Sequence, residues 1–408
     1  MCYEETLNYI HALGKFSLPA GLERITKVLD ILGNPQNCFK SVHIAGTNGK
    51  GSVSAMLSSV FKCAGYKTGL FISPFIINFR ERIQINGEFI SETDLCFYAE
   101  KIKNTNVKLT EFEFITALAF LYFKEMGIDV LICETGLGGR FDATNTLDNL
   151  ACAVITKIGL DHTAILGDNL QKIAYEKCGI LRDCPTITSP NQEIEALNVI
   201  KDMATDLIEP DFNQIKIIKS DIDGSTYIYK EKEYSISLCG EYQIENSLTV
   251  IETLNSCGYE IPYNIICKGL KETVFPARME VISRTPLIVL DGAHNPDGAS
   301  VLSKELEKYS GEVTAIIGMM KDKDYKEFLK NTLCYCKNAV AVEVPNLPRS
   351  LAAKELCESA NEFCSCYTAE NLNSALDMAL ETSCGKPIFV FGSLYLASAI
   401  RPILKEKF

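Results

Sequence analysis

The 408-residue sequence predicts an α/β protein, with a larger domain built on a mostly parallel sheet and a smaller α/β domain after it. Short apolar runs recur, each followed by a segment of helical period, which is typical of parallel strands flanked by helices. The segment from about 211 to 239 alternates apolar and polar residues, which predicts a small accessory antiparallel sheet. The strand and helix rhythm then restarts with PLIVLDGAHN, which indicates the second domain.

The first elements form a predicted βαβ unit. FKSVHIAG is expected to be a strand that runs into a loop, and KTGLFIS (67–73) is expected to be the next strand. Apolar residues between them recur at helical spacing, and Gly65 is a suitable helix stop. The apolar stripe consists of Val53, Met56, Leu57, Val60 and Phe61.

Polar residues stand where the next predicted strands end. DVLICETG (129–136) is a buried strand with Glu134 near its end, and ACAVITKIG (151–159) ends just before Asp161 and His162. Open α/β sheets bind their ligands at the carboxyl ends of the strands. We therefore expect a ligand site at this edge.

The second domain is predicted from VTAIIGMM, NAVAVEVP and PIFVFGS, each separated from the next by a helical segment. Its length of about 125 residues is an ordinary domain size. We expect the boundary near 274–284 and divide the chain into residues 1–278 and 279–408.

Composition argues against some classes of function. A formal charge of -12 and a pI near 5.1 argue against a nucleic-acid or membrane-surface protein, because no basic face dominates. Apolar runs are much shorter than the ~20 residues that span a bilayer. The seventeen cysteines, with no signal peptide ahead of Met1, indicate reduced thiols and a cytoplasmic protein. The C-x-C pairs Cys334/Cys336 and Cys364/Cys366 lack the spacing and the histidines of a zinc site.

The stretch AGTNGKGS (45–52) predicts a phosphate-binding loop between a strand and a helix. Its glycines let backbone N–H groups approach phosphate oxygens, and the helix N-terminus adds a favourable partial charge. Lys50 supplies a mobile cation. A Gly-rich turn without a ligand is the plainer alternative. The residues expected to contact phosphate are Gly46, Thr47, Asn48, Gly49, Lys50, Gly51 and Ser52.

This loop has Gly51 between Lys50 and Ser52, and in that form it resembles the loop of the Mur ligase superfamily. It is most similar to the loop of the bifunctional folylpolyglutamate synthase/dihydrofolate synthase family. Other segments resemble that family in its own order, over essentially the whole chain. They are LERITKVLDILGNPQ, SPFIINFRERIQING, ETGLGGRFDATN, IGLDHTAILGDNLQKIAYEKCGIL, GEYQIENSLTVIETL, FPARME, DGAHNPDGA and GSLYLAS.

The resemblance implies a P-loop NTPase-like first domain that carries ATP and a folate-site loop. It implies a Rossmann-like glutamate ligase domain over 279–408 and a monomer. The expected activity is an ATP-dependent amide ligase that adds L-glutamate to a reduced folate, to dihydropteroate, or to both, through an acyl phosphate. We weigh two alternatives. A Mur ligase of cell-wall synthesis needs more chain than the 44 residues before Ala45. A regulatory NTPase is expected to carry a base-selecting N-K-x-D motif, which this sequence lacks.

Magnesium ligands are implied by the same resemblance. Ser73, Glu134 and His162 would hold two Mg²⁺ ions. Magnesium prefers oxygen ligands, so the carboxylate of Glu134 fits from its chemistry alone, whereas the histidine rests on the family. Read without the resemblance, Ser73 could cap a turn and His162 could be an ordinary loop residue.

Five further positions have implied roles near ATP. Lys177 would be carbamylated and catalytic, although by pattern alone it is a surface lysine of a helix. Asn246 and Arg278 would contact ATP, and Asp291 and the catalytic His294 would face it from the smaller domain. By spacing alone, DGAHNP is only a strand-to-helix turn.

The substrate loop is expected within 73–90. Phe75, Phe79 and Arg82 are candidate contacts for the pterin ring or a carboxylate, and packing with surface ion pairs is the equal alternative.

Overall fold

The structure is a computed structural model that describes residues 1–14, 18–309 and 311–408. It divides into two compact units. The larger unit holds Met1–Ile218, Thr226–Ser237 and Gln243–Thr273, and the smaller one holds Lys219–Ser225, Leu238–Tyr242 and Val274–Phe408. Each unit has its own sheet and its own core.

In the described part of the larger unit, eight strands form a sheet in the order β4-β3-β2-β5-β1-β6-β7-β8. The run from β2 to β8 is parallel, and β3 and β4 add an antiparallel edge. The strands are β1 (Lys40–Ala45), β2 (Thr68–Phe71), β3 (Ile83–Ile85), β4 (Glu88–Phe89), β5 (Val130–Glu134), β6 (Leu150–Ile155), β7 (Thr186–Thr188) and β8 (Leu207–Ile208). The predicted mostly parallel sheet is confirmed.

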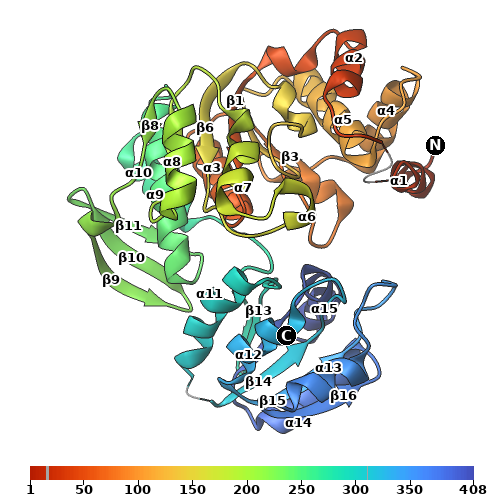
Figure 1. Ribbon diagram of the computed structural model, residues 1–408, viewed down its shortest axis with the longest axis vertical. Helices are drawn as coiled ribbons and strands as arrows, with labels where there is room; N and C mark the ends of the chain where they lie inside the picture. The colour runs from red at the N-terminus through yellow and green to blue at the C-terminus, as the bar shows by residue number, and fades with distance from the viewer. Residues whose placement is uncertain (15–17, 310) are drawn as a thin grey trace. The chain divides into compact units, whose positions relative to one another are not determined.

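Helices cover this sheet and supply its core (Figure 1). They are α1 (Tyr3–Ala12), α2 (Glu23–Ile31), α3 (Lys50–Cys63), α4 (Glu92–Lys103), α5 (Glu111–Met126), α6 (Thr163–Leu166), α7 (Leu170–Lys177), α8 (Ile194–Met203), α9 (Glu241–Ser256) and α10 (Tyr263–Lys271). α3 begins inside the predicted phosphate loop, and Gly65 follows its end with a φ of 89°.

α5 shows how local sequence fixes the start and end of a helix. Thr110 caps its first turn in a capping box with Glu113, and Gly127 ends it in the left-handed conformation at φ 61°. The apolar body of α5 packs against α1, α2 and α4, which Figure 1 shows gathered on one side of the unit. On the other side, α7 and α8 close a second core over β6 and β1.

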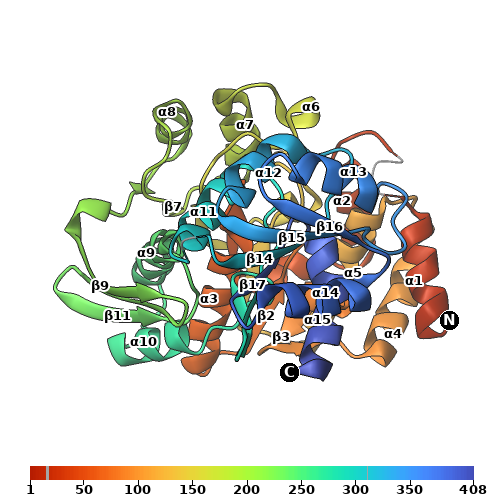
Figure 2. The ribbon, with the colours of Figure 1, turned by 90° about the horizontal axis from the view of Figure 1, so that it is seen from below.

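The segment after residue 211 forms the predicted antiparallel sheet, in the order β11-β10-β9. Its strands are β9 (Ile215–Asp221), β10 (Gly224–Tyr229) and β11 (Lys232–Ile236). α10 packs on β11, and both views place them together (Figures 1 and 2).

The smaller unit repeats the α/β plan. Its described residues give a six-stranded sheet in the order β12-β13-β17-β14-β15-β16, parallel except for β12. The strands are β12 (Glu280–Arg284), β13 (Leu287–Leu290), β14 (Val313–Ile317), β15 (Cys336–Val342), β16 (Ser365–Ala369) and β17 (Ile388–Phe391). The helices are α11 (Pro296–Glu307), α12 (Tyr325–Leu333), α13 (Ala353–Ala360), α14 (Leu372–Ser383) and α15 (Leu394–Lys407). Figure 2 shows β14, β15 and β16 side by side.

The seventeen cysteines of the chain are free thiols. Among the described residues, no group of three or more His, Cys, Asp or Glu side chains is arranged to hold a metal. None of the helices described combines the length and the apolar character needed to cross a membrane.

Candidate active site

The predicted phosphate loop connects β1 to α3, and at two of its positions there is room only for glycine. A Cβ on Gly46, whose φ is 152°, would lie 1.9 Å from Oγ1 of Thr156. A Cβ on Gly49, at φ 91°, would lie 2.4 Å from Oδ1 of Asn246. The backbone can therefore make this turn only without side chains at these positions.

The two halves of the loop differ in whether their backbone N–H groups already have a carbonyl acceptor. The backbone N–H groups of Thr47 and Asn48 donate to the carbonyl of Lys157 at 2.9 and 3.1 Å. The hydroxyl of Thr47 bonds the carbonyl of Gly159 at 3.1 Å. These contacts clamp the first half of the loop to the loop after β6. The N–H groups of the first turn of α3, which begins at Lys50, have no carbonyl partner within that helix and can donate to an anion.

Lys50 folds back onto the loop that carries it. Its Nζ donates to the carbonyls of Gly46 and Thr47 at 3.1 and 3.3 Å, and it lies 3.8 Å from Oε1 of Glu134. Glu134 ends β5 and is only 4 % exposed. Since a buried carboxylate needs a cation or hydrogen-bond donors, Lys50 supplies part of that stabilisation here.

Lys177, at the end of α7, reaches the same loop from the other side. Its Nζ donates to the carbonyl of Gly46 at 2.8 Å, and the residue is 5 % exposed. Burial, together with the nearby charge of Lys50, lowers the pKa of Lys177 from 10.5 to about 7. The structure therefore contradicts the plainer interpretation of Lys177 as a surface lysine.

The predicted metal ligands lie around this point with different degrees of burial. The backbone N–H of Ser73 donates to Oε2 of Glu134 at 3.3 Å, and the hydroxyl of Ser73 accepts from Arg82 at 3.3 Å. His162 has a left-handed backbone at φ 51°, its side chain is 51 % exposed, and its Nε2 lies 3.8 Å from Oδ2 of Asp161.

A small polar pocket of about 40 Å³ joins most of these groups. It is lined by Gly46, Thr47, Lys50, Thr135, Gly136, Leu137, Gly138, Asp161, His162 and Lys177. Glu134 adjoins the pocket through Lys50, and Ser73 adjoins Glu134. The larger unit thus brings the predicted loop, the predicted metal ligands and Lys177 together.

Asn246 also belongs to this site. On α9 it donates to Oε1 of Gln243 at 2.9 Å, and Gln243 donates to the hydroxyl of Ser52 at 3.2 Å. The hydrogen-bonded pair therefore ties α9 to the first turn of α3, beside the loop.

The smaller unit collects the remaining predicted residues after β13. Asp291 is buried and accepts from the backbone N–H of Met279 at 2.8 Å and of Ala293 at 2.7 Å. Burial raises its pKa, and Arg278 opposes that rise. Nδ1 of His294 lies 2.9 Å from the carbonyl of Gly292. Arg278, Asp291 and His294 form one cluster at the end of this strand.

The candidate substrate residues pack on one another. The guanidinium of Arg82 lies 5.3 Å from the ring centroid of Phe75 and 5.6 Å from that of Phe79. Phe79 and Arg82 are each 5 % exposed. Within the larger unit these three side chains therefore pack against one another.

The sequence pattern placed Asp161 beside His162 at a strand end without giving it a role, and it did not single out Asp142. Asp161 lines the polar pocket, and Asp142 is buried behind it, where it accepts from the backbone N–H groups of Gly136 and Leu137 at 2.9 and 2.8 Å. Asp142 stands in the quoted ETGLGGRFDATN segment, and an acidic residue shortly after three closely spaced glycines was the available signal.

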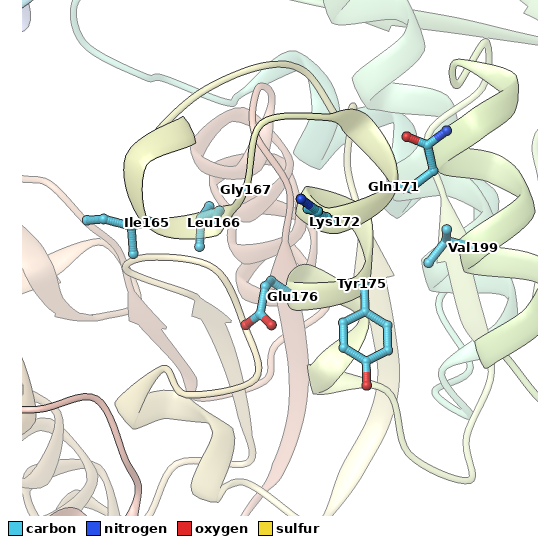
Figure 3. A pocket seen from close by; sticks show the side chains of 8 residues that line it. All are labelled: Ile165, Leu166, Gly167, Gln171, Lys172, Tyr175, Glu176 and Val199. Carbon is cyan, nitrogen blue, oxygen red and sulfur yellow. The ribbon is translucent and has the colours of Figure 1, made fainter.

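A second, open hollow of about 480 Å³ lies between α6, α7 and α8 (Figure 3). Its lining residues are Ile165, Leu166, Gly167, Gln171, Lys172, Tyr175, Glu176 and Val199. None of the predicted site residues, all of which the structure describes, lines this hollow. The polar pocket at the phosphate loop is therefore the candidate active site.

The fold and the loop define a Mur ligase type of nucleotide-binding protein, and comparison with known proteins agrees. Residues 44–254 match the Mur ligase middle domain, and residues 277–404 match the dihydrofolate synthetase C-terminal domain. The chain belongs to the folylpolyglutamate synthase/dihydrofolate synthase family.

Similar proteins match over nearly their whole length. The folylpolyglutamate synthase of Lacticaseibacillus casei is 34 % identical over 99 % of both chains, and the dihydrofolate synthase/folylpolyglutamate synthase of Escherichia coli is 31 % identical over 98 % of this chain and 95 % of that one. A solved structure of Escherichia coli FolC in complex with DHPP and ADP has a TM-score of 0.90 at 28 % identity, covering 100 % of this chain and 98 % of that chain. Mycobacterium tuberculosis folylpolyglutamate synthase, complexed with ADP and AMPPCP, has a TM-score of 0.88 at 28 % identity, covering 98 % and 99 %.

Proposed function

We propose that this protein is an ATP-dependent ligase that joins L-glutamate to the carboxylate of a reduced folate, of dihydropteroate, or of both. The observation that carries this proposal is the convergence of Lys50 and Lys177 on one phosphate loop in a chain that matches its family end to end. The relatives that were solved with ADP, AMPPCP and DHPP support a nucleotide and a pterin as substrates.

The reaction would take place in two steps. A carboxylate oxygen of the pterin substrate attacks the γ-phosphorus of ATP, the bond to the β–γ bridging oxygen breaks, and ADP leaves an acyl phosphate behind. The amino group of L-glutamate, after losing a proton to a base, attacks the acyl carbon. Phosphate then leaves with the electrons of the broken C–O bond, and the amide remains.

The loop and Lys50 would stabilise the phosphates. The N–H groups at the start of α3 can donate to phosphate oxygens, and Ser52 and Asn246 stand beside them. Lys50 would have to leave the carbonyls of Gly46 and Thr47 to reach the γ-phosphate, where its charge offsets the charge that develops there.

We propose two magnesium ions bound with ATP, held by Ser73, Glu134 and His162. The donors fit in part: Glu134 is a buried carboxylate with Lys50 as a cation 3.8 Å away, and Ser73 lies directly beside it. The exposed imidazole of His162 is the softer ligand of the set. Magnesium at these residues would neutralise charge on the transferred phosphoryl group.

Lys177 is proposed to be carbamylated. A neutral amine is needed to react with carbon dioxide, and a pKa of about 7 provides one near neutral pH. The product would be a carbamate anion beside Gly46, so the local charge would change from positive to negative.

Further roles are proposed on the resemblance. Arg278, Asp291 and His294 of the smaller unit would act on ATP and the transferred group. Phe75 and Phe79 would contact the pterin substrate together with Arg82.

The remaining proposals concern the organisation of the chain. We propose a division between the domains near residues 278 and 279, supported by family matches that end at 254 and begin at 277 and by a smaller unit whose longest segment begins at Val274. We propose a monomer, on the resemblance, and a cytoplasmic location, which agrees with seventeen free thiols.

The two rival functions receive less support. A Mur ligase of cell-wall synthesis would not match a dihydrofolate synthetase C-terminal domain. A regulatory NTPase would not need a second unit with clustered Arg278, Asp291 and His294.

The test is ADP release by the purified protein with Mg-ATP, omitting in turn L-glutamate, dihydropteroate and tetrahydrofolate. We expect release that requires glutamate and one of the pterins, and the pterin that is required identifies the substrate. Lys50→Met should lower the rate by about a hundredfold or more, whereas Lys62→Met, at an exposed position of the same helix, should not change it. Release that is indifferent to all three omissions would refute the ligase in favour of the NTPase.

A further inference from the structure

A buried histidine stands in the centre of the large sheet. His43 lies on β1, between β5 and β6, opposite Cys133 and Ala153, and is 0 % exposed. A central strand of a parallel sheet is normally apolar on both faces. A buried imidazole at this position therefore needs a hydrogen-bond partner to offset its desolvation.

His43 has such a partner in Thr144. Nε2 of His43 lies 2.8 Å from Oγ1 of Thr144, and that hydroxyl donates to Oδ1 of Asp142 at 2.6 Å. A hydroxyl can donate only one hydrogen bond, and this one is donated to Asp142. His43 must therefore donate from Nε2, which makes it the neutral Nε2–H tautomer with its lone pair on Nδ1.

Burial explains why the imidazole stays neutral. Burial, with a smaller contribution from the charge of Arg182, lowers the pKa of His43 to about 3. The ring is therefore not a proton carrier at neutral pH. What it supplies is one fixed donor to Thr144.

Asp142 links the hydrogen bond between His43 and Thr144 to the backbone of the pocket. Its Oδ1 also accepts from the backbone N–H of Thr144 at 3.0 Å, and its Oδ2 accepts from the N–H groups of Gly136 and Leu137. Gly136 and Leu137 both line the polar pocket at the phosphate loop. Because all four donors are directed at one carboxylate, rotation of that carboxylate would displace part of the pocket wall.

We infer that His43 is a positioning residue for the nucleotide pocket, acting through Thr144 and Asp142 on the backbone of Gly136 and Leu137. The inference rests on the proposed function only for the identity of the nucleotide. The alternative is a buried histidine that merely fills the sheet, and this alternative predicts lower stability without a change in the pocket.

The test compares nucleotide affinity with stability in matched variants. His43→Met fills similar space without a donor, Thr144→Val removes the hydroxyl, and His43→Gln returns an N–H donor near the position of Nε2. Ser41→Ala is the control, because Ser41 is buried two residues earlier on the same strand and its hydroxyl has no partner among the described residues. Dissociation constants for Mg-ADP are measured by calorimetry, and unfolding midpoints are measured on the same samples.

We expect His43→Met and Thr144→Val each to weaken Mg-ADP binding by about tenfold, as expected for one lost hydrogen bond to an ordered network. The double variant should be no weaker than the weaker single one, because both changes break the same chain of bonds. His43→Gln should restore binding to within about twofold of wild type, and Ser41→Ala should leave it unchanged.

Folded His43→Met or Thr144→Val protein that binds Mg-ADP as wild type does would overturn the inference, as would losses that multiply in the double variant. If His43→Met does not fold, Thr144→Val decides the question. Wild-type protein that binds Mg-ADP but forms no amide with any pterin would refute the proposed function and leave this test intact. Wild-type protein that does not bind Mg-ADP would refute both.

Discussion

Carbamylation of Lys177 can be tested because its environment sets how often the amine is neutral. An amine with a pKa of 10.5 is neutral in roughly one molecule in 3,000 at pH 7, whereas one with a pKa of about 7 is neutral in about half. Burial near Lys50 therefore raises the reactive fraction by roughly a thousandfold. Carbon dioxide should add to Lys177 in preference to the exposed lysines.

The assay is ¹³C NMR of the protein in ¹³C-bicarbonate at pH 8, read beside the rate of ADP release. We expect one slowly exchanging carbamate signal in the wild type, and a rate that rises with bicarbonate after the buffer has been depleted of carbon dioxide. Lys177→Met should lose the signal and most of the activity. Lys172→Met is the matched control on the same helix, since Lys172 is 61 % exposed and paired with Asp168 at 3.0 Å.

The reasoning would be refuted by a fully active wild-type protein that shows no carbamate signal at saturating bicarbonate. It would also be refuted if Lys172→Met removed the signal and Lys177→Met did not, because the burial of Lys177 is the stated cause of its reactivity.

Three further predictions concern single side chains. Lys177 binds its proton less tightly in the folded protein than in the unfolded chain, so the free energy of unfolding should rise with pH between 7 and 10.5. In carbonate-free buffer, the stability of the wild type relative to Lys177→Met should increase by about 2 kcal/mol from pH 7 to pH 9. Asp142→Asn places an amide against four donors and should cost about 3 kcal/mol in denaturant unfolding, whereas Asp148→Asn at a 78 % exposed site should cost less than about 0.5 kcal/mol; equal losses would count against the Asp142 network. Glu134→Gln should raise the magnesium concentration for half-maximal activity by about tenfold or more, and an unchanged magnesium titration would remove Glu134 from the ligand set.

Much of the fold follows from apolar runs that the sequence displays openly. β1, β2, β5 and β6 are buried along nearly their full length, and each was predicted from such a run. The strands that were missed are short or lie at an edge. β7 has three residues, and β16 is mostly exposed, so neither produces an apolar run long enough to recognise.

Some residues of the candidate site could be predicted from the sequence and others could not. The loop could be derived from its glycines and Lys50, because the phosphate chemistry demands those residue types. Lys177 could not be derived, since only the packing of α7 against the loop shows that it is buried. His43 lay inside a predicted strand, and its role depends on Thr144 and Asp142, which are about a hundred residues away along the chain.

The acyl phosphate is the central chemical claim, and the transfer of an oxygen isotope tests it most directly. The pterin substrate that the omission assay identifies is labelled with ¹⁸O in its reacting carboxylate and incubated with Mg-ATP and L-glutamate, and the phosphate is analysed by mass spectrometry. The account predicts one ¹⁸O atom in the phosphate for each amide formed, because the carboxylate oxygen that attacks the γ-phosphorus leaves with it. Unlabelled phosphate released in step with amide would contradict an acyl phosphate intermediate.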